Sequence, residues 1–434
     1  MITSQPSTPW WSPVTPAAAE QHGGSLPFAA LMTFLFITVV SPQSWFPALA
    51  SLRLAMLAAV IAAVGLLADR LAHGGSVAAW TRETWLALGL FVWAVATVPF
   101  SYWPGGSVSL ITDTYAKTLI VFWLLGIVVD TRERFRFTLW MLTLTAIPIA
   151  VTAVHHFMTG EYFPPSAKNE QRIMGYLGPL AGNPNDLALT LNLILPFTLT
   201  LLFTSRGRAV RLFLVGIALV DAMAVVMTWS RAGFVTLATT LALTCWRLAK
   251  RGRPGWAVAM LVLALVAVPL FPAGYVDRLA TMRDIDDDPT HSAQTRWSDT
   301  IAAAEFVLAH PLAGAGAGQN ILALNEQRGA KWKMVHNVYL EYAVDLGLPG
   351  LVLFLLILHY NAAAVRRVRR LAAAAEPSGE IVFMAEGLQT SLVAFSLAGI
   401  FHPVAYHPYF YYIAGLGVAM QTMAQRWPDT TSGS

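Results

Sequence analysis

Long apolar runs constrain this sequence more than any other feature. Runs of about 16 to 25 mostly apolar residues, separated by polar breaks, are typical of helices that cross a membrane. Twelve such runs can be distinguished, and they begin near Pro27, Leu52, Trp85, Thr114, Phe137, Asn185, Leu212, Gly233, Trp256, His336, Ile381 and Tyr406. The sequence therefore predicts an all-α polytopic membrane protein with about twelve transmembrane helices. A count of eleven or thirteen stays open, because three of the runs are short or interrupted by aromatic residues.

The composition supports this fold class. Hydrophobic residues make up 56% of the chain and charged residues 12%, and the mean hydropathy is +0.56. A water-soluble domain of 434 residues does not reach such values. The net charge of +4 indicates cytoplasmic loops of a membrane protein, because basic residues gather on that side. We therefore expect membrane lipids as partners and no nucleic acid.

The basic residues also give an orientation. Arginines and lysines gather in alternate breaks, at residues 70–82, 132–136, 206–211, 247–253 and 366–370. The positive-inside rule assigns these five breaks to the cytoplasm. Both termini are then expected to be cytoplasmic, with residues 1–25 forming a disordered tail and residues 426–434 a short one.

One long polar segment, residues 274–335, interrupts the apolar runs on the outer side. It separates nine expected helices in residues 26–273 from three in residues 336–425. Residues 292–309 predict an amphipathic helix that lies on the membrane surface or against the bundle. Its broad apolar face would carry Trp297, Ile301, Ala304, Phe306 and Leu308.

The rest of this segment contains a helix stop and a turn. His310 and Pro311 would end the first helix, and the glycines at 314, 316 and 318 would form a flexible turn. A second short helix is expected over residues 319–327. We therefore predict an outer loop that contains two helices.

His336 stands where the polar segment meets an apolar run. On a helix of about 100° per residue, Ala343, Gly347 and Gly350 fall within about 40° of the His336 direction. Another helix could pack closely on this stripe of small residues. An imidazole with an ordinary pKa near 6.5 can take a proton from a hydroxyl at neutral pH, although a lone histidine is as often a cap. Asn337 and Glu341 are candidate supporting residues.

Arg231 is the most unusual cation on the outer side. It lies in a tight turn between two apolar runs, against the positive-inside trend, so it needs an anionic partner or lipid headgroups. A guanidinium can bind phosphate through two hydrogen bonds. Arg231 is therefore a candidate for holding a phosphate-bearing ligand.

Acidic residues give weaker signals. Asp221 lies deep in an apolar run, where an acid is a functional hypothesis by default, but an interhelical hydrogen bond explains it equally simply. Asp284 and Asp286 resemble an Asp-x-Asp metal motif, but Asp287 and Asp288 extend it into an exposed acidic loop. No cluster has zinc-ligand spacing, so no metal or cofactor is expected.

Four pieces of sequence together resemble a known family. Arg172-Ile-Met-Gly leads into Gly182-Asn-Pro-Asn-Asp-Leu-Ala, and Ser230-Arg-Ala-Gly follows. Arg296-Trp continues to His310-Pro-Leu-Ala-Gly-Ala-Gly, and His336-Asn-x9-Gly-x2-Gly is the last. Over residues 172–350 the chain resembles the bacterial O-antigen ligases, in a superfamily that also includes O-antigen polymerases and protein O-oligosaccharyltransferases.

The resemblance implies a GT-C-like glycosyltransferase of the bacterial inner (cytoplasmic) membrane, with an active site on the periplasmic face. The two helices of residues 274–335, then a periplasmic loop, would form a lid over this site. Its donor would be O-antigen linked to undecaprenyl diphosphate and its acceptor a sugar hydroxyl of the lipid A-core oligosaccharide, with no metal or cofactor. His336 would be the catalytic base. Arg231 and Arg296, with Arg172 as a third, would bind the diphosphate. Direct displacement would invert the anomeric centre and complete lipopolysaccharide.

Two alternatives remain open. An O-antigen polymerase would pass the glycan to another undecaprenyl-linked unit, and only the His-Asn-x9-Gly-x2-Gly spacing favours a ligase over it. A secondary transporter would place polar residues at the middle of the membrane in two repeated halves. Asp221 is the one feature that supports a transporter.

Overall fold

The computed structural model describes residues 24–73, 76–162, 172–173, 175, 180–267, 271, 275, 292–377 and 379–425. Within these ranges the fold is all-α, with no strand. The residues outside them include nearly all of the predicted N-terminal tail, the predicted C-terminal tail and the aspartates at 284 and 286.

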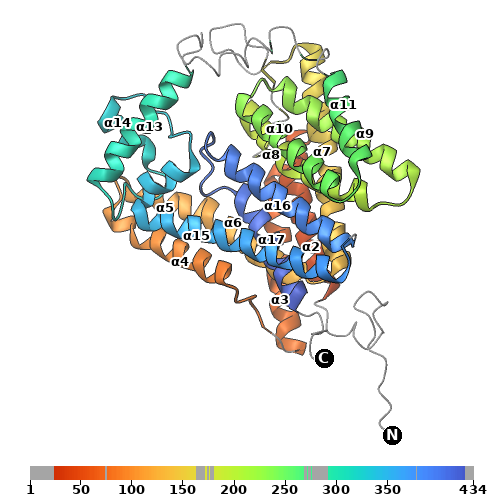
Figure 1. Ribbon diagram of the computed structural model, residues 1–434. Coiled ribbons are helices and arrows are strands. Elements are labelled where there is room, and N and C mark those ends of the chain that lie inside the picture. The colour runs from red at the N-terminus through yellow and green to blue at the C-terminus, as the bar shows by residue number, and fades with distance from the viewer. Residues whose placement is uncertain are drawn as a thin grey trace.

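The helices before the long outer segment form the larger part of the bundle (Figure 1). They are α2 (Ser25–Val40), α3 (Leu54–His73), α4 (Arg82–Ala96), α5 (Pro104–Leu110), α6 (Ala116–Val128), α7 (Arg132–Thr159), α8 (Pro184–Thr204), α9 (Arg208–Met227), α10 (Arg231–Lys250) and α11 (Pro254–Ala267). A π-helical turn, Ile111–Tyr115, joins α5 to α6. The later helices are α13 (Ser292–Ala309), α14 (Asn320–Arg328), α15 (Val338–Ala375), α16 (Glu380–Ala398) and α17 (Pro408–Gln425).

Each of the twelve predicted apolar runs coincides with a helix, when α5 and α6 are taken together. Eight helical segments among the described residues are long and apolar enough to cross a membrane. They are Pro47–His73, Pro104–Val128, Arg132–Thr159, Pro184–Thr204, Arg208–Met227, Arg231–Lys250, Val338–Ala375 and Glu380–Ala398. The all-α polytopic fold is therefore confirmed, and the count of twelve spans stays a prediction.

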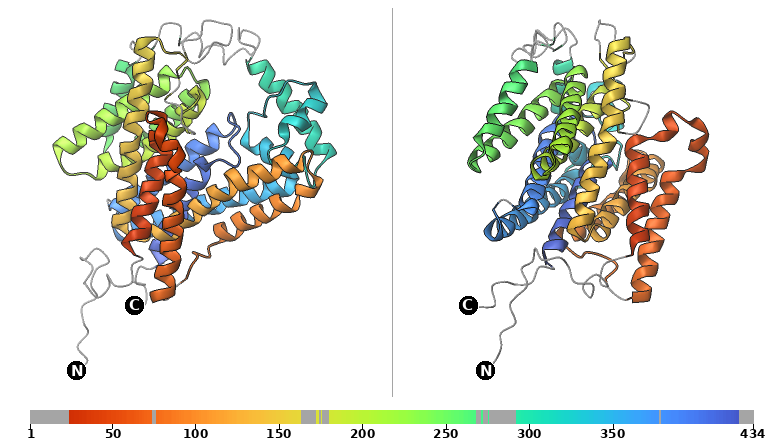
Figure 2. Two further views of the ribbon diagram at one scale, coloured as in Figure 1. Left: turned by 180° about the vertical axis from the view of Figure 1, so that it is seen from behind. Right: turned by 90° about the vertical axis from the view of Figure 1, so that its right-hand side faces the viewer.

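The helix α8 lies at the centre of the bundle. In its most apolar window 94% of the residues are buried, and it packs against α7, α9, α10 and α16. Most of α16 is buried as well. At one edge α2 and α3 lie side by side, as the right-hand view of Figure 2 shows. The long α15 runs along α4 and reaches the outer helices α13 and α14 (Figure 1).

The two outer helices are where the sequence predicts them, and most of the predicted apolar face of α13 points away from the bundle. Phe306 is fully buried, whereas Trp297, Ile301 and Leu308 are 62%, 45% and 82% exposed and Ala304 is exposed too. The buried face instead carries Asp299, Ala302, Ala303, Phe306 and Val307. The physical reason is that Asp299 turns inward to form a buried ion pair with Arg328 of α14, and small alanines beside it allow close packing.

The glycine-rich turn between α13 and α14 is docked, not flexible. Residues 314–317 are buried. The backbone N–H groups of Ala315 and Gly316 donate to the carbonyl oxygens of Val344 and Asp345, both at 2.8 Å. The Asp345 carboxylate accepts a hydrogen bond from the backbone N–H of Gly318, also at 2.8 Å. The turn is therefore part of the core beside α15.

The helix α15 is broken at Gly347, which has φ 68° and ψ −175°. A Cβ there would lie 2.1 Å from the carbonyl oxygen of Leu312. Leu348 N–H donates to the Pro311 carbonyl at 2.8 Å, and Trp93 Nε1 donates to the Leu346 carbonyl at 2.8 Å. The helix therefore does not continue unbroken below His336, as the stripe of small residues predicted. The loop of Pro311 and Leu312, and not another helix, packs against Gly347. The backbone carbonyl group of Leu346 at the break accepts a hydrogen bond from Trp93 instead.

Candidate functional site

His336 lies just outside α15, in a segment held on two sides. The N–H of Val335 donates to the side chain of Asn320 in α14, at 3.2 Å. The N–H of Val338 donates to the Gly399 carbonyl at the end of α16, at 2.8 Å. His336 is consequently fixed where the outer helices meet the loop between α16 and α17.

The electrostatics of His336 suit a proton acceptor. Burial lowers the pKa of its imidazole below the usual 6.5, and the nearby positive charge of Arg296 lowers it further. The ring is therefore neutral at neutral pH. Its Nδ1 is buried and has no hydrogen-bond partner within the described part of the chain. A neutral imidazole nitrogen without a hydrogen-bond partner can accept a proton from any hydroxyl that reaches it.

Arg296 comes from α13 and lies close to two histidines. Its positive charge contributes to lowering the pKa of His336 and also that of His402. The guanidinium is therefore within electrostatic range of both rings. The structure thus brings Arg296 and His336 together, although they are 40 positions apart in the sequence.

His402 is a residue of this site that the sequence did not single out. It lies in the loop between α16 and α17, is 2% exposed, and has Nδ1 2.7 Å from the Ala398 carbonyl and Nε2 3.2 Å from the Asn185 carbonyl. Burial is the main cause that lowers the pKa of His402 to about 4. A neutral imidazole carries one N–H, so only one of the two carbonyl groups receives a hydrogen bond at neutral pH.

Arg172 and the start of α10 meet at the side chain of Asn185. Asn185 Oδ1 accepts hydrogen bonds from Arg172 Nη2 at 2.9 Å and from Ser230 Oγ at 3.0 Å. Ser230 caps α10 by accepting from the N–H of Gly233 at 3.1 Å. Arg231 is the first residue of α10 and is partly exposed. The Asn185 and Ser230 motifs therefore form one structural unit.

Close packing holds this unit together. A Cβ on Gly233 would lie 2.7 Å from the Cβ of Ala188, so α8 and α10 approach closely here. Asn192 Nδ2, one turn further into α8, donates to the Gly233 carbonyl at 3.0 Å. The Ser-Arg-Ala-Gly sequence is thus explained by a cap, a partly exposed cation and two small residues against α8.

The two halves of the site are linked through Asn185 and His402. Asn185 contacts Arg172 and Ser230 with its side chain and His402 with its carbonyl oxygen, while His402 lies near Arg296 and His336. All of these groups lie at the same ends of α8, α10, α15 and α16. The structure thereby connects Arg172 with Arg296 and His336 through Asn185 and His402, and Arg231 follows Ser230 in the sequence.

The two candidate supporting residues have structural partners elsewhere. The side chain of Asn337 caps α15 by accepting from the N–H groups of Tyr339 and Leu340, at 2.9 and 3.1 Å. Glu341 is buried, and its carboxylate accepts from the N–H of Ala405 at 3.0 Å. Both therefore position the segments around His336: Asn337 the start of α15, and Glu341 the loop that carries His402.

Metal-ligating residues do not gather in the described part of the chain. No group of three or more His, Cys, Asp or Glu side chains there could hold a metal ion. The Asp284 and Asp286 pair lies outside the described residues. The charged side chains near His336 are Arg296, Lys333 and the acidic Asp299. Their excess of positive charge suits an anionic, phosphate-bearing ligand.

Comparison with known families gives two matches. Residues 216–355 match the family model described as O-antigen ligase, a range that contains Arg231, Arg296 and His336. Residues 17–161 match a family of unknown function, DUF5935. No curated protein matches the chain significantly. The first match confirms the resemblance to the O-antigen ligases over residues 216–355.

Proposed function

Starting from the O-antigen ligase domain in residues 216–355, we propose that this membrane protein is an O-antigen ligase. It transfers a finished glycan from undecaprenyl diphosphate to a sugar hydroxyl of lipid A-core. The reaction takes place on the periplasmic face of the inner membrane. The family supports a glycosyltransferase-like enzyme that handles lipid-linked polysaccharide, and the choice of donor and acceptor is our proposal.

One observation carries the proposal: a neutral histidine with an unpartnered Nδ1 lies beside an arginine, at the end of the bundle where the chain leaves the apolar helices. Both substrates are lipid-linked and lie in the same leaflet, so each can reach such a place laterally. The outer helices α13 and α14 form one side of the site through Arg296 and Asn320. We propose that they act as its lid.

The chemistry requires one base and an anionic leaving group. His336 takes the proton of the acceptor hydroxyl as its oxygen attacks the anomeric carbon. The bond from that carbon to the diphosphate oxygen breaks, and the diphosphate leaves with the electron pair. Attack from the side opposite the leaving group inverts the anomeric centre.

The arginines stabilise the charge that grows on the diphosphate. Arg231 and Arg296 contact it directly, and Arg172 contributes through the shared Asn185. Fixed donors of this kind are effective because they are oriented before the charge develops, and losing one typically costs about 10² to 10³ in rate. Such electrostatic stabilisation needs no metal.

The test is in vitro transfer with purified protein, undecaprenyl-diphosphate-linked glycan and lipid A-core. We expect glycan-bearing lipid A-core to form, to survive EDTA, and to fall by about 10² to 10⁴ in rate for His336→Ala. His359→Ala is the matched control, since His359 is an exposed histidine further along α15. A normal rate in His336→Ala would reject the proposed base, and loss of activity in EDTA would reject the metal-independent mechanism.

The same experiment separates the ligase from the polymerase. Longer undecaprenyl-linked chains without glycan on lipid A-core would identify a polymerase and overturn our acceptor.

Asp221, the one feature that supports a transporter, lines an apolar cavity of about 300 Å³ between α7 and α9. The other residues that line it carry no charge: Ile147, Val151, Phe213, Gly216, Ile217 and Val220.

A further inference from the structure

A second basic cluster lies at the opposite ends of the helices that build the site. Arg247 is in the last turn of α10, sixteen residues after Arg231. At 1.5 Å per residue these two positions are about 24 Å apart along the helix axis. Glu386 lies near the start of α16, whose other end leads to His402, and Arg369 lies near the end of α15.

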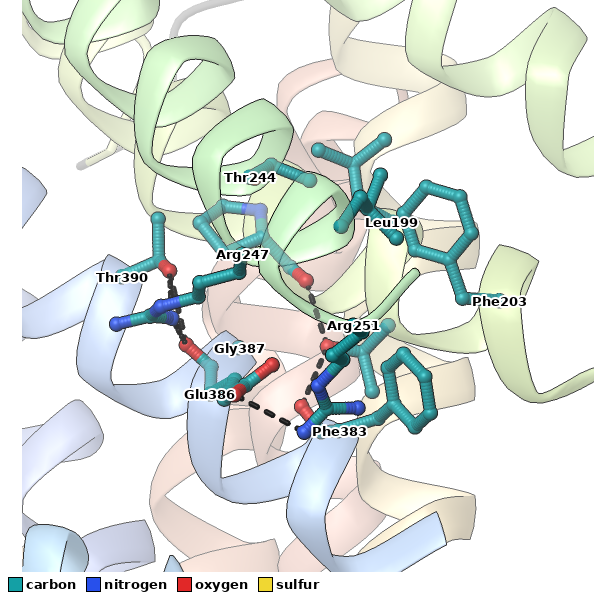
Figure 3. Close-up of a pocket in the computed structure, with 12 residues that line it drawn as sticks. Leu199, Phe203, Thr244, Arg247, Arg251, Phe383, Glu386, Gly387 and Thr390 are labelled. Atoms are coloured by element: carbon teal, nitrogen blue, oxygen red, sulfur yellow. Dashed lines mark hydrogen bonds and ion pairs between the residues drawn. The ribbon is translucent and has the colours of Figure 1, made fainter. Parts of the chain in front are cut away.

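Three arginines converge on one glutamate in this cluster. Arg251 Nη2 and Arg369 Nη1 approach the same carboxylate oxygen of Glu386, at 3.0 and 3.4 Å. Arg247 donates to the Glu386 backbone carbonyl and to Thr390 Oγ1, the latter at 2.7 Å. Figure 3 shows Arg247 and Arg251 reaching from α10 to opposite sides of Glu386. Three positive charges and one negative charge leave this cluster with an excess of two positive charges.

Several donors of the cluster are not satisfied. The Arg247 Nε, Arg251 Nη1 and Arg369 Nε atoms are buried and have no hydrogen-bond partner among the described residues. Leaving a charged donor unpaired and out of water is costly. Arg251 and Glu386 are nevertheless only 17% and 11% exposed. An anion with several oxygen atoms would satisfy these donors and balance the charge.

A cavity lies beside two of these arginines. It has a volume of about 30 Å³ and is lined by Arg247, Arg251, Glu386 and Thr390 and, on its apolar wall, by Leu199 and Phe203 of α8 (Figure 3). One water needs about 10 to 15 Å³ of such space, so the cavity accepts a small polar group and no acyl chain. Phe203 packs against Trp256 of α11, and α11 exposes a largely apolar surface.

From this geometry we infer a binding site for a phosphate group, formed by Arg247 and Arg251 beside Glu386, with Arg369 adding its positive charge through its ion pair with Glu386. The planar guanidinium groups present paired N–H donors that match phosphate oxygens. The phosphate belongs to an anionic phospholipid headgroup, whose acyl chains lie along the apolar helices outside, or to free phosphate. Basic pockets between transmembrane helices on the cytoplasmic side bind such headgroups. The site shares no residue with the proposed active site, so the two proposals stand or fall separately.

The test measures lipid binding by the full-length protein in nonionic detergent, with native mass spectrometry. We expect phosphatidylglycerol to bind at least about fivefold more tightly than phosphatidylcholine with the same acyl chains. Arg251→Gln should lose most of that preference. Arg366→Gln, which removes an equal charge from an exposed position on α15, should keep it. Equal binding of the two lipids by the wild type, or equal effects of the two variants, would overturn the site.

A competition experiment and one further variant extend this test. Inorganic phosphate at millimolar concentration should leave phosphatidylglycerol binding unchanged if the ligand is a lipid headgroup, and should compete with it if free phosphate is the ligand. Glu386→Gln removes the competing carboxylate and should strengthen phosphatidylglycerol binding. If this variant folds poorly without lipid, we expect phosphatidylglycerol to raise its melting temperature more than it raises that of the wild type. If the variant shows neither tighter binding nor a larger rise in melting temperature, the arginines only serve a structural ion-pair network and the site is rejected.

Discussion

Asn185 makes the contacts that join the separate parts of the candidate site. Its side chain accepts hydrogen bonds from Arg172 and Ser230, and its carbonyl oxygen lies 3.2 Å from Nε2 of His402. Its own N–H donates to Asn183, which caps α8, at 3.0 Å. A residue with so many fixed partners orients others, so we assign it a positioning role.

Substitutions of Arg231 test whether binding of phosphate through two hydrogen bonds matters for the reaction. A lysine keeps the charge but offers a compact ammonium instead of a planar fork. We expect Arg231→Lys to lose nearly as much transfer rate as Arg231→Ala, about 10² to 10³. The measurement is the initial rate of transfer by the two variants at equal amounts of folded protein. A lysine variant with close to normal activity would show that charge alone suffices.

The pH dependence of transfer should report the His336 imidazole. Because burial and Arg296 lower the pKa of His336, the active neutral form dominates at neutral pH and is lost as the pH falls through a value below the ordinary 6.5. We expect kcat/KM to be constant near neutrality and to decline on the acid side. Arg296→Gln should move this decline to higher pH, because it removes a charge that disfavours the imidazolium.

The pH profile also tests the assignment of the base. A decline centred at or above pH 6.5 would contradict the lowered pKa of His336 and with it the assignment of His336 as the base. An unmoved profile in Arg296→Gln would show that this arginine does not act on the base. Both profiles are measured with purified enzyme in the same detergent, with stability checked at each pH.

At the level of single residues the sequence offered candidates for the chemistry but did not show which residues contact them. His336 and the arginines could be selected because a base and cations are unusual at a membrane boundary. His402 carried no comparable signal, and Asn185 was marked only as part of the motif that begins at Gly182. Their importance comes from contacts across about 217 positions of sequence, which no local pattern encodes.

The break in α15 is the element on which the outer helices depend. Gly347 has a backbone conformation that is open essentially only to glycine, and its Cα faces the Leu312 carbonyl. We expect Gly347→Ala to lower the melting temperature strongly, since strain of this kind costs roughly 1 to 3 kcal/mol before any clash. Gly216→Ala is the control, because Gly216 lies in α9 with no atom near its missing Cβ.

The melting temperatures of these two variants are compared in the same detergent. A Gly347→Ala protein as stable as the Gly216→Ala protein would mean that α15 can straighten without loss. In that case the docked turn would contribute little to the fold.

Helices were predictable from the sequence, whereas breaks and buried faces were not. Hydropathy alone predicts where the apolar helices lie, because every backbone polar group in a membrane must be satisfied within the helix. A glycine in an apolar run is equally consistent with a continuous helix. The break at Gly347 could therefore be recognised only from its contacts with Pro311 and Leu312 in the structure. In the same way, α13 has two apolar stripes, and the Asp299 to Arg328 ion pair decides which one is buried.

Across the whole molecule, α8, α10, α15 and α16 carry the candidate active site at one end and the basic cluster at the other. The distribution of basic residues predicts that the first end is periplasmic and the second cytoplasmic. Cysteine labelling tests this orientation after the native Cys245 is replaced by serine. We expect a membrane-impermeant maleimide to label His310→Cys in spheroplasts, and Arg367→Cys only after the membrane is permeabilised; the reverse result would invert the topology.

The hydrogen bonds between the glycine-rich turn and α15 also set an order of events during synthesis. Residues 314–318 leave the ribosome before Val344 and Asp345, the residues whose oxygen atoms they bind. A nascent chain that ends near residue 335 therefore contains α13 and α14 but none of the acceptors that hold their turn in place. We expect the outer helices to mature only after the first half of α15 has been inserted, so a failure of that single insertion step would leave this turn open to proteases.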